Sequence, residues 1–464
     1  MKYPVPHMGL VWVVIFSLIV NASFSQKSPK AEGGGLEVAK VVCIDEKRSS
    51  IIKAELQASL AELETKGLAL PVDLTSTVKF DWPVRLSSKS KDPSFFGVSN
   101  YVDHDPEYPN KVRDYMCGTR TYDLASGYNH RGLDIFALPF AQLGQLNNLV
   151  EIVAAAPGTI INKLDGNPDN NCSFCTNCMW NAVYIRHADG SIAWYGHLKS
   201  GSLTSKPVGS EVIAGEFLGV MGSSGSSSAP HLHFEVWANQ NFTQLVDPFA
   251  GNCNTLNGNT SWWNEQRPYR RPAINKIMTG SAPVTLPACP GLEITNEKNV
   301  FTFGETLCVT NFLQDQIMGV PVEMQLIMPN GSVWTTWNHA SPNTFSGSFW
   351  FWNPWSLPNI AGYWQYKVTY TGTGQTVTHT FYHGNDPPVT TLKSGNWFDP
   401  GIWSNGIVPG ETAKVFVCHP VLLNSDKTIF SLVVNEGGQV IVENGKNLTV
   451  THAVFHQMHE RVKD

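Results

Sequence analysis

The chain has little charge and no block of like charges. Asp, Glu, Lys and Arg make up 15% of its 464 residues, where about 25% is usual for soluble globular proteins. The net charge is −6, and no Lys/Arg-rich run offsets it. These absences exclude the basic surface of a nucleic-acid-binding protein, so we expect no nucleic-acid partner.

Long apolar runs are also missing beyond the N-terminus. Residues 9–20 (GLVWVVIFSLIV) follow Lys2, and the small residues Ser23 and Ser25 precede Gln26. This is the pattern of a signal peptide over residues 1–25, and its apolar run is shorter than a spanning helix. We expect a mature monomer without a membrane span, either secreted or retained in the periplasm or at the cell surface.

The chain has no HExxH motif, so it lacks the glutamate base of that class of metalloprotease. It is instead rich in Gly (39), Pro (29) and Trp (15), which is typical of a mainly β, turn-rich extracellular protein. Since 464 residues exceed one ordinary domain, we expect several β-rich domains.

One stretch of the chain holds two histidines that could act in catalysis or bind a metal. Residues 222–237 read GSSGSSSAPHLHFEVW. His231 and His233 lie two apart in an apolar run, and on a strand such residues share one face. The sequence therefore predicts a strand that presents two imidazoles together, after a Gly/Ser-rich loop.

Two earlier stretches supply matching groups. Residues 128–136 (YNHRGLDIF) carry His130 and Asp134 in a segment that favours an extended backbone. Residues 191–198 (SIAWYGHL) have the pattern of a short strand that ends in His197. Two histidines and one aspartate suit zinc and leave one position for water. The other two histidines would then serve proton transfer.

In this order, the three motifs resemble those of lysostaphin-type zinc metalloendopeptidases, a family that includes the β-lytic endopeptidases. The resemblance covers residues 80–249. It implies one zinc ion per chain held by His130, Asp134 and His233, with His197 and His231 as catalytic residues. It also implies an antiparallel β-sheet domain with a groove. None of the five positions is substituted.

The resemblance implies hydrolysis of peptide bonds, mostly in peptidoglycan cross-links and in some members in Gly-rich extracellular proteins such as elastin. Two other functions stay open. One is a catalytically silent groove protein that binds the cell wall or activates a partner hydrolase. The other is a carbohydrate-binding adhesin that contacts polysaccharide through Trp-rich accessory modules.

The domain boundaries follow from changes of pattern along the chain. Residues 26–75 are a helical leader, with helical periodicity at 45–66. The leader either covers the active site as a prosegment or serves as a spacer packed on the domain. The peptidase domain spans 76–250, including an Asn- and Cys-rich loop at 165–181 that either rims the groove or lies away from it.

The remaining residues predict accessory modules. Residues 251–285 are a linker that packs Trp262 and Trp263 on the peptidase. Residues 286–387 resemble an immunoglobulin-like β-sandwich, with an Asn330-Gly331 hairpin signal. Residues 390–452 form a further β-rich module, β-helix-like or sandwich-like, that resembles modules of secreted Bacteroidetes proteins. Residues 453–464 are a tail.

Nine cysteines in an exported chain predict disulfides. We expect the 172–178 segment (CSFCTNC) to pair with Cys117 or Cys253, and Cys289 with Cys308. The odd number leaves at least one thiol outside these pairs.

Two further histidines are excluded from the predicted site. His187 (IRHADGS) is expected on a surface hairpin, and His104 (DHDP) in an ordinary turn.

Overall fold

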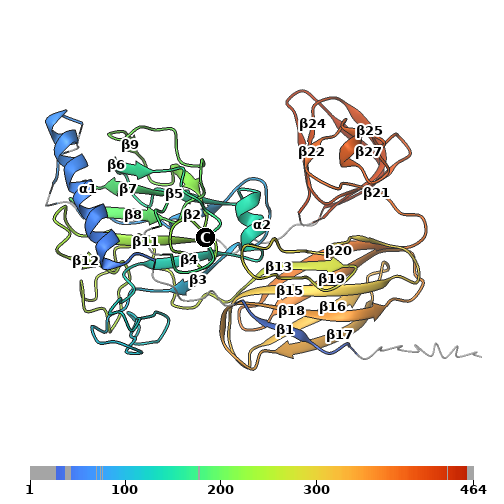
Figure 1. Cartoon of the computed structure of the whole chain (residues 1–464). Helices are drawn as coiled ribbons and strands as arrows, with labels where there is room; N and C mark the ends of the chain where they lie inside the picture. The colour runs from blue at the N-terminus through green and yellow to red at the C-terminus, as the bar shows by residue number, and fades with distance from the viewer. Residues whose placement is uncertain are drawn as a thin grey trace, which may run out of the picture.

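The computed structural model describes residues 28–456, except 37–42, 69–70, 74, 76, 176–177 and 436. They form a mainly β structure, as predicted. Figure 1 shows the predicted peptidase region of green strands flanked by the helix α1 (Glu46–Thr65), a yellow and orange sandwich beside it, and a red C-terminal module above the sandwich. The predicted signal peptide lies outside the described residues.

An 8-stranded antiparallel sheet organises the peptidase region, in the order β3-β4-β11-β8-β7-β6-β9 with β12 paired to β11. Its strands are β3 (Phe96–Asn100), β4 (Leu133–Ala137), β6 (Gly158–Leu164), β7 (Ala182–Arg186), β8 (Ile192–Gly196), β9 (Glu211–Val212), β11 (His231–Trp237) and β12 (Leu245–Val246). A 3-stranded sheet packs beside it, formed by β2 (Val84–Leu86), β5 (Val150–Val153) and β10 (Phe217–Val220). The short helix α2 (Ala141–Leu146) follows β4.

The two faces of the large sheet bury different clusters. Along β11, the face toward the main core carries Leu232, Phe234 and Val236. Side chains alternate along a strand, so His231, His233, Glu235 and Trp237 share the other face. On that face, Trp237 packs with Trp194 and with α1. The face that carries the two histidines is therefore the one that the leader helix covers.

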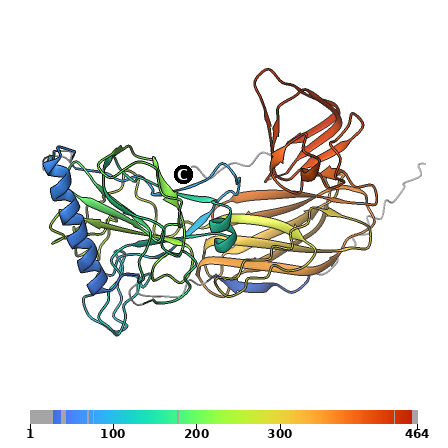
Figure 2. The same ribbon diagram turned by 45° about the horizontal axis from the view of Figure 1, so that its top comes forward.

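The leader is tied to two parts of the molecule. Its first strand, β1 (Glu32–Gly35), pairs with the sandwich strand β18 (Phe345–Ser356). The helix α1 (Glu46–Thr65) follows and matches the predicted helix. Figures 1 and 2 both place α1 at the end of the peptidase region away from the sandwich. The helix buries Ile52, Leu56, Leu60 and Leu63 against the sheet.

We expect Leu56→Ala to loosen α1 from the sheet. Leu56 is fully buried among aromatic side chains, and truncation of a buried leucine costs about 2–5 kcal/mol. The matched control is Ile51→Ala on the same helix, because Ile51 is 40% exposed and should change stability by no more than about 0.5 kcal/mol. Hydrogen exchange of the α1 amides measures the difference. Equal exchange in the two variants would show that this face does not dock the helix.

Two sheets form the sandwich and share one core. The 4-stranded sheet consists of β1, β13 (Ala273–Gly280), β15 (Thr306–Gln316) and β18 (Phe345–Ser356). The 5-stranded sheet consists of β14 (Val300–Phe301), β16 (Pro321–Ile327), β17 (Val333–Ala340), β19 (Gly362–Tyr370) and β20 (Gln375–His383). The immunoglobulin-like topology itself stays a prediction.

The sandwich begins earlier than its predicted first residue, 286. The strand β13 lies in the stretch expected to be a linker, but it pairs along its length with β15. Its alternation was obscured by buried polar residues such as Asn275 and Thr279. Within the sandwich, the Asn330-Gly331 turn joins β16 and β17 as predicted.

Most of the sandwich tryptophans are core residues. Trp337, Trp350, Trp352 and Trp355 are at most 7% exposed, and they pack on one another in a single core. These four side chains are therefore not available to stack on a sugar.

The C-terminal module is a stack of parallel strands, which favours the β-helix-like alternative. One sheet holds β21 (Val389–Thr390), β23 (Lys414–Val417), β25 (Lys427–Val434) and β27 (Leu448–His456). The other holds β22 (Gly395–Asn396), β24 (Pro420–Leu423) and β26 (Gln439–Val442). A short 3-10 helix, Pro400–Ile402, lies between β22 and β23. Because β27 continues to His456, the strand passes the residue at which the tail was expected to begin.

Disulfides form, but the predicted pairs of cysteines are wrong. Cys117 pairs with Cys253, Cys172 with Cys289, and Cys175 with Cys178. Cys253 reaches Cys117 because its amide donates to the carbonyl of Tyr115. A disulfide does tie down the 165–181 loop, but it joins the loop to the segment between the sandwich strands β13 and β14. Cys308 lies in the sandwich interior, 1% exposed, and forms none of these bonds.

No helix among the described residues is long and apolar enough to cross a membrane.

Candidate functional site

The site is centred on two neighbouring strands. Asp134 on β4 lies directly across from His233 on β11, and His233 in turn lies across from Gly196 on β8. Residues opposite each other in an antiparallel pair share a face, so this register places Asp134 beside His233 and brings His197, the next residue, within reach. The predicted strand over 231–237 is confirmed.

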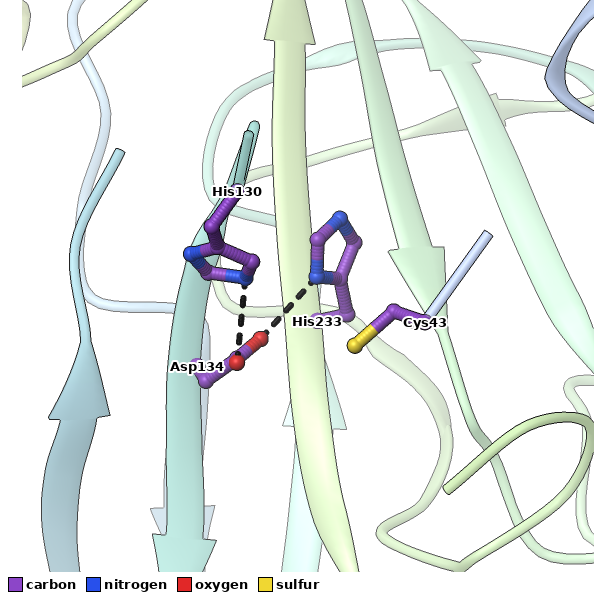
Figure 3. Close-up of side chains that lie close together, drawn as sticks. All are labelled: Cys43, His130, Asp134 and His233. Atoms are coloured by element: carbon purple, nitrogen blue, oxygen red, sulfur yellow. Dashed lines mark hydrogen bonds and ion pairs between the residues drawn. The ribbon is translucent and has the colours of Figure 1, made fainter. Parts of the chain in front are cut away.

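His130 reaches the same point from the loop before β4. Its amide donates to the carbonyl of Tyr122, and its ring stacks on the Tyr122 ring with centroids 4.7 Å apart. Gly132 leaves the space that His233 occupies, since a Cβ at Gly132 would lie 2.6 Å from the His233 ring. Figure 3 shows the rings of His130 and His233 on either side of the Asp134 carboxylate.

Hydrogen bonds fix which nitrogen of each ring carries a proton. The Nδ1 atoms of His130, His197 and His231 lie 2.6–2.8 Å from the carbonyl oxygens of Tyr101, Ser224 and Ala229, respectively. A carbonyl only accepts, so each Nδ1 donates. In His233, Nε2 donates to Glu235 Oε2 at 3.1 Å. The other nitrogen of each neutral ring is left as a lone pair, a common arrangement in metal-ligating histidines.

These lone pairs converge on one carboxylate. His130 Nε2 lies 3.0 Å from Asp134 Oδ2, and His233 Nδ1 lies 2.9 Å from Asp134 Oδ1. Two acceptors at this separation repel unless a proton or a cation lies between them. Nitrogen and carboxylate donors are those that zinc prefers. The residues therefore fit a metal ion held by His130 Nε2, Asp134 and His233 Nδ1.

The electrostatics agree with a cation site. Burial raises the pKa of Asp134, but His130 and His233 outweigh it and hold that pKa well below the usual range. Burial lowers the pKa of His130, yet Asp134 reverses this and raises it to about 9, so without a metal a proton lies between His130 Nε2 and the carboxylate, in the place that a cation would take. The buried carboxylate is thus ionised at neutral pH and attracts positive charge into the site.

His197 and His231 form the adjacent pair. Their ring centroids are 4.3 Å apart, and His231 Nε2 lies 3.9 Å from Asp134 Oδ1. His197 follows the end of β8 with φ of +64°, a strained conformation for a non-glycine residue that recurs at functional sites. The structure therefore brings together all five residues that the sequence singled out.

Sequence reasoning missed two residues of the site. Glu235 shares the face of His231 and His233, and the period of two along β11 already pointed to it. Cys43 comes from the leader: its Sγ lies within 4.8 Å of the ligand atoms of His130, Asp134 and His233, and also within 4.8 Å of those of His197 and His231. The only indication of Cys43 in the sequence was the odd number of cysteines and its position just before a predicted helix.

The 165–181 loop lies beside the site. Asn170 bridges to Ser223, and Asn171 donates to the carbonyl of Gly225 at 2.6 Å. Ser223 in turn bonds to Ser227, whose hydroxyl lies 3.3 Å from His231 Nδ1. The loop thus supports the Gly/Ser segment that precedes β11.

Neither of the excluded histidines joins the cluster, but the prediction for His187 is wrong. It is 1% exposed instead of lying on the surface, since its Nδ1 donates to the carbonyl of Pro157 and Phe80 packs against its ring. His104 is also buried and lies 2.8 Å from the Asp247 carboxylate.

Comparison with known proteins places the site in a family. Residues 128–248 match the model of peptidase family M23. A stretch of 70 residues, 15% of this chain, is 44% identical to the DD-carboxypeptidase/endopeptidase Mpg of Neisseria meningitidis. Another of 96 residues, 20% of the chain, is 32% identical to the cell division protein DipM of Caulobacter vibrioides. Each match spans only 15% of the relative's length.

Among solved structures, the catalytic domain of the antimicrobial peptidase lysostaphin from Staphylococcus simulans is 25% identical. The match covers 28% of this chain and 83% of that domain, with a TM-score of 0.20. On the family match and the site geometry, residues 128–248 form a domain of peptidase family M23.

Proposed function

We propose that the chain is an exported zinc metalloendopeptidase that hydrolyses peptide cross-links of peptidoglycan. The observation that carries the proposal is that the lone-pair nitrogens of His130 and His233 lie 3.0 and 2.9 Å from the buried Asp134 carboxylate, with His197 and His231 paired beside them. His130, Asp134 and His233 would hold the zinc, and His197 and His231 would act beside it.

Zinc bound there would lower the pKa of a water molecule and polarise the scissile carbonyl. The chain's own residues supply the proton transfers. His197 and His231 each present Nε2 toward the site and hold Nδ1–H on a backbone carbonyl, so either Nε2 has the geometry to accept a proton from water. One takes this proton, and the other stabilises the oxyanion or protonates the leaving amine.

The substrate class rests on the family resemblance and the named relatives. A DD-carboxypeptidase/endopeptidase and a cell division protein each match a part of the chain. A Gly-rich extracellular protein is the alternative substrate.

A silent groove protein that activates another hydrolase is the second candidate function. No specific observation favours it, because all five site residues are present and close together. Zinc content and turnover together separate the two functions: a silent protein gives no products in any metal state.

We expect digestion of purified peptidoglycan to depend on zinc. The full chain is assayed before and after limited proteolysis of its leader, with and without a chelator, and the products are read by mass spectrometry. New amine termini should disappear with the chelator and return with added zinc. A zinc-loaded protein that cleaves neither peptidoglycan nor Gly-rich proteins would contradict the proposal.

A further inference from the structure

The leader residue Cys43 lies inside the metal site. Figure 3 shows its sulfur directed toward Asp134 and the two flanking imidazoles. The side chain is 7% exposed, and Sγ lies 3.3 Å from the Tyr122 hydroxyl and 3.9 Å from His231 Nε2. One sulfur atom is thus within reach of both the proposed zinc ligands and the proposed proton-transfer pair.

The surroundings of Cys43 are those of a ligand. A buried cysteine usually behaves as a small apolar side chain. Cys43 shares an apolar cluster with Ile44 and Trp180, but its sulfur also faces a carboxylate and imidazole nitrogens. A three-ligand zinc site keeps one open position, and a thiolate is a preferred zinc ligand.

The segment around Cys43 is held firmly on the side of α1. Asp45 caps the helix by accepting from the amide of Arg48 at 2.7 Å. Glu46 on the first turn pairs at 2.5 Å with Arg131, the residue after His130. Farther along, Lys53 lies 3.7 Å above the Trp237 ring. The docked helix therefore fixes Cys43 at the metal site with little conformational freedom.

The helix also covers the surface next to the ligands. Tyr184, Trp194, Trp237 and Phe242 lie under α1 on the face of the sheet that carries His231 and His233. An aromatic surface continuous with a catalytic centre is suited to hold a substrate chain. While α1 is docked, both this surface and the open metal position are occupied by the leader.

We propose that the Cys43 thiolate is the fourth zinc ligand of the uncleaved chain and keeps the peptidase latent until the leader is withdrawn. The inference rests on the proposed function. Binding is a simple exchange: the thiol gives its proton to solvent, its sulfur takes the position of the water, and withdrawal of Cys43 returns that position to water. Neither hydrolysis nor oxidation is required for the thiolate to be displaced.

Cobalt(II) substitution of the full chain tests the ligand directly. A thiolate on cobalt(II) gives a charge-transfer band in the near-ultraviolet that nitrogen and oxygen ligands lack. The wild-type chain should show this band, and Cys43→Ala should lose it. Cys43→Ser, which preserves the size of the side chain, should lose it as well. Cys308→Ala is the matched control, since Cys308 is also buried and outside the disulfides, and it should retain the band.

Hydrolysis of peptidoglycan by the same zinc-loaded chains tests latency. If Cys43 occupies the metal in 99% of molecules, Cys43→Ala should raise the rate about 100-fold over the wild type, and Cys308→Ala should leave it unchanged. A cobalt-loaded wild type without the thiolate band overturns the inference, and so do equal rates for active wild type and active Cys43→Ala. Failure of the proposed function is distinguishable: the band is present in the wild type, yet Cys43→Ala and the leader-cleaved chain both give no products.

Discussion

His231→Ala should lower turnover about 10²–10⁴-fold, the contribution usual for a positioned acid or base, while one zinc ion stays bound. The reason is that the two histidines of β11 have different proposed roles: His233 binds zinc and His231 transfers protons. His231 Nε2 lies 3.9 Å from Asp134 Oδ1, whereas His233 Nδ1 lies 2.9 Å from it. In His130→Ala, by contrast, both zinc and turnover should be lost.

Zinc content is measured by elemental analysis, and rates are compared on chains whose leader has been cleaved in the same way. His187→Ala is the matched control, because His187 is a buried histidine of the same region that lies outside the cluster. It should retain turnover within a few-fold while losing some stability. Retained turnover in His231→Ala, or retained zinc in His130→Ala, would refute the assignment of roles.

The local part of the site was predictable because strand geometry determines it. Alternation along 231–237 places His231 and His233 on one face, and the structure adds that Asp134 is the cross-strand neighbour of His233. The sequence could not give that register, which depends on pairing between strands about 100 residues apart. The family resemblance supplied the missing step, since it named His130, Asp134 and His233 as a set.

Features that depend on distant packing were not predictable. His187 has the sequence of an exposed hairpin, yet Phe80 and Pro157 enclose it from elsewhere in the chain. The disulfide partner of Cys172 lies 117 residues away, and the spacing of cysteines does not encode such a pairing. Cys43 is the same kind of case, because only the docking of α1 brings it to the proposed zinc ligands.

The two roles expected of the leader, a spacer packed on the domain and a prosegment that covers the active site, are compatible with each other. The helix packs on the domain, as a spacer would, through Leu56 and its apolar neighbours. The same docking carries Cys43 into the site, as a prosegment would require. A helix that stabilises the uncleaved chain can therefore also hold the proposed inhibitory residue, Cys43, in place.

Asp315→Ala should destabilise the protein by about 3–5 kcal/mol, because it leaves a buried charge without its partner. Arg120 belongs to the peptidase region and Asp315 to the sandwich strand β15. Their side chains are 5% and 4% exposed, and Arg120 Nη2 lies 2.6 Å from Asp315 Oδ1. Asp315 also accepts from the amide of Arg271 at 2.9 Å, so the carboxylate joins three segments.

Denaturant unfolding of two variants tests the pair. In the matched control, Asp386→Ala, the lost partner is Lys414, also 2.6 Å away, but this pair is 83% and 46% exposed. It should cost no more than about 1 kcal/mol. The double variant Arg120→Met/Asp315→Leu should recover much of the loss, because apolar replacements leave no buried charge. A cost below about 1 kcal/mol for Asp315→Ala would mean that the peptidase region and the sandwich are stable independently of this contact. The expected larger cost would show that contact with the sandwich stabilises the peptidase region. The sandwich would then hold the leader in two ways, directly through its pairing with β1 and indirectly through the sheet on which α1 docks.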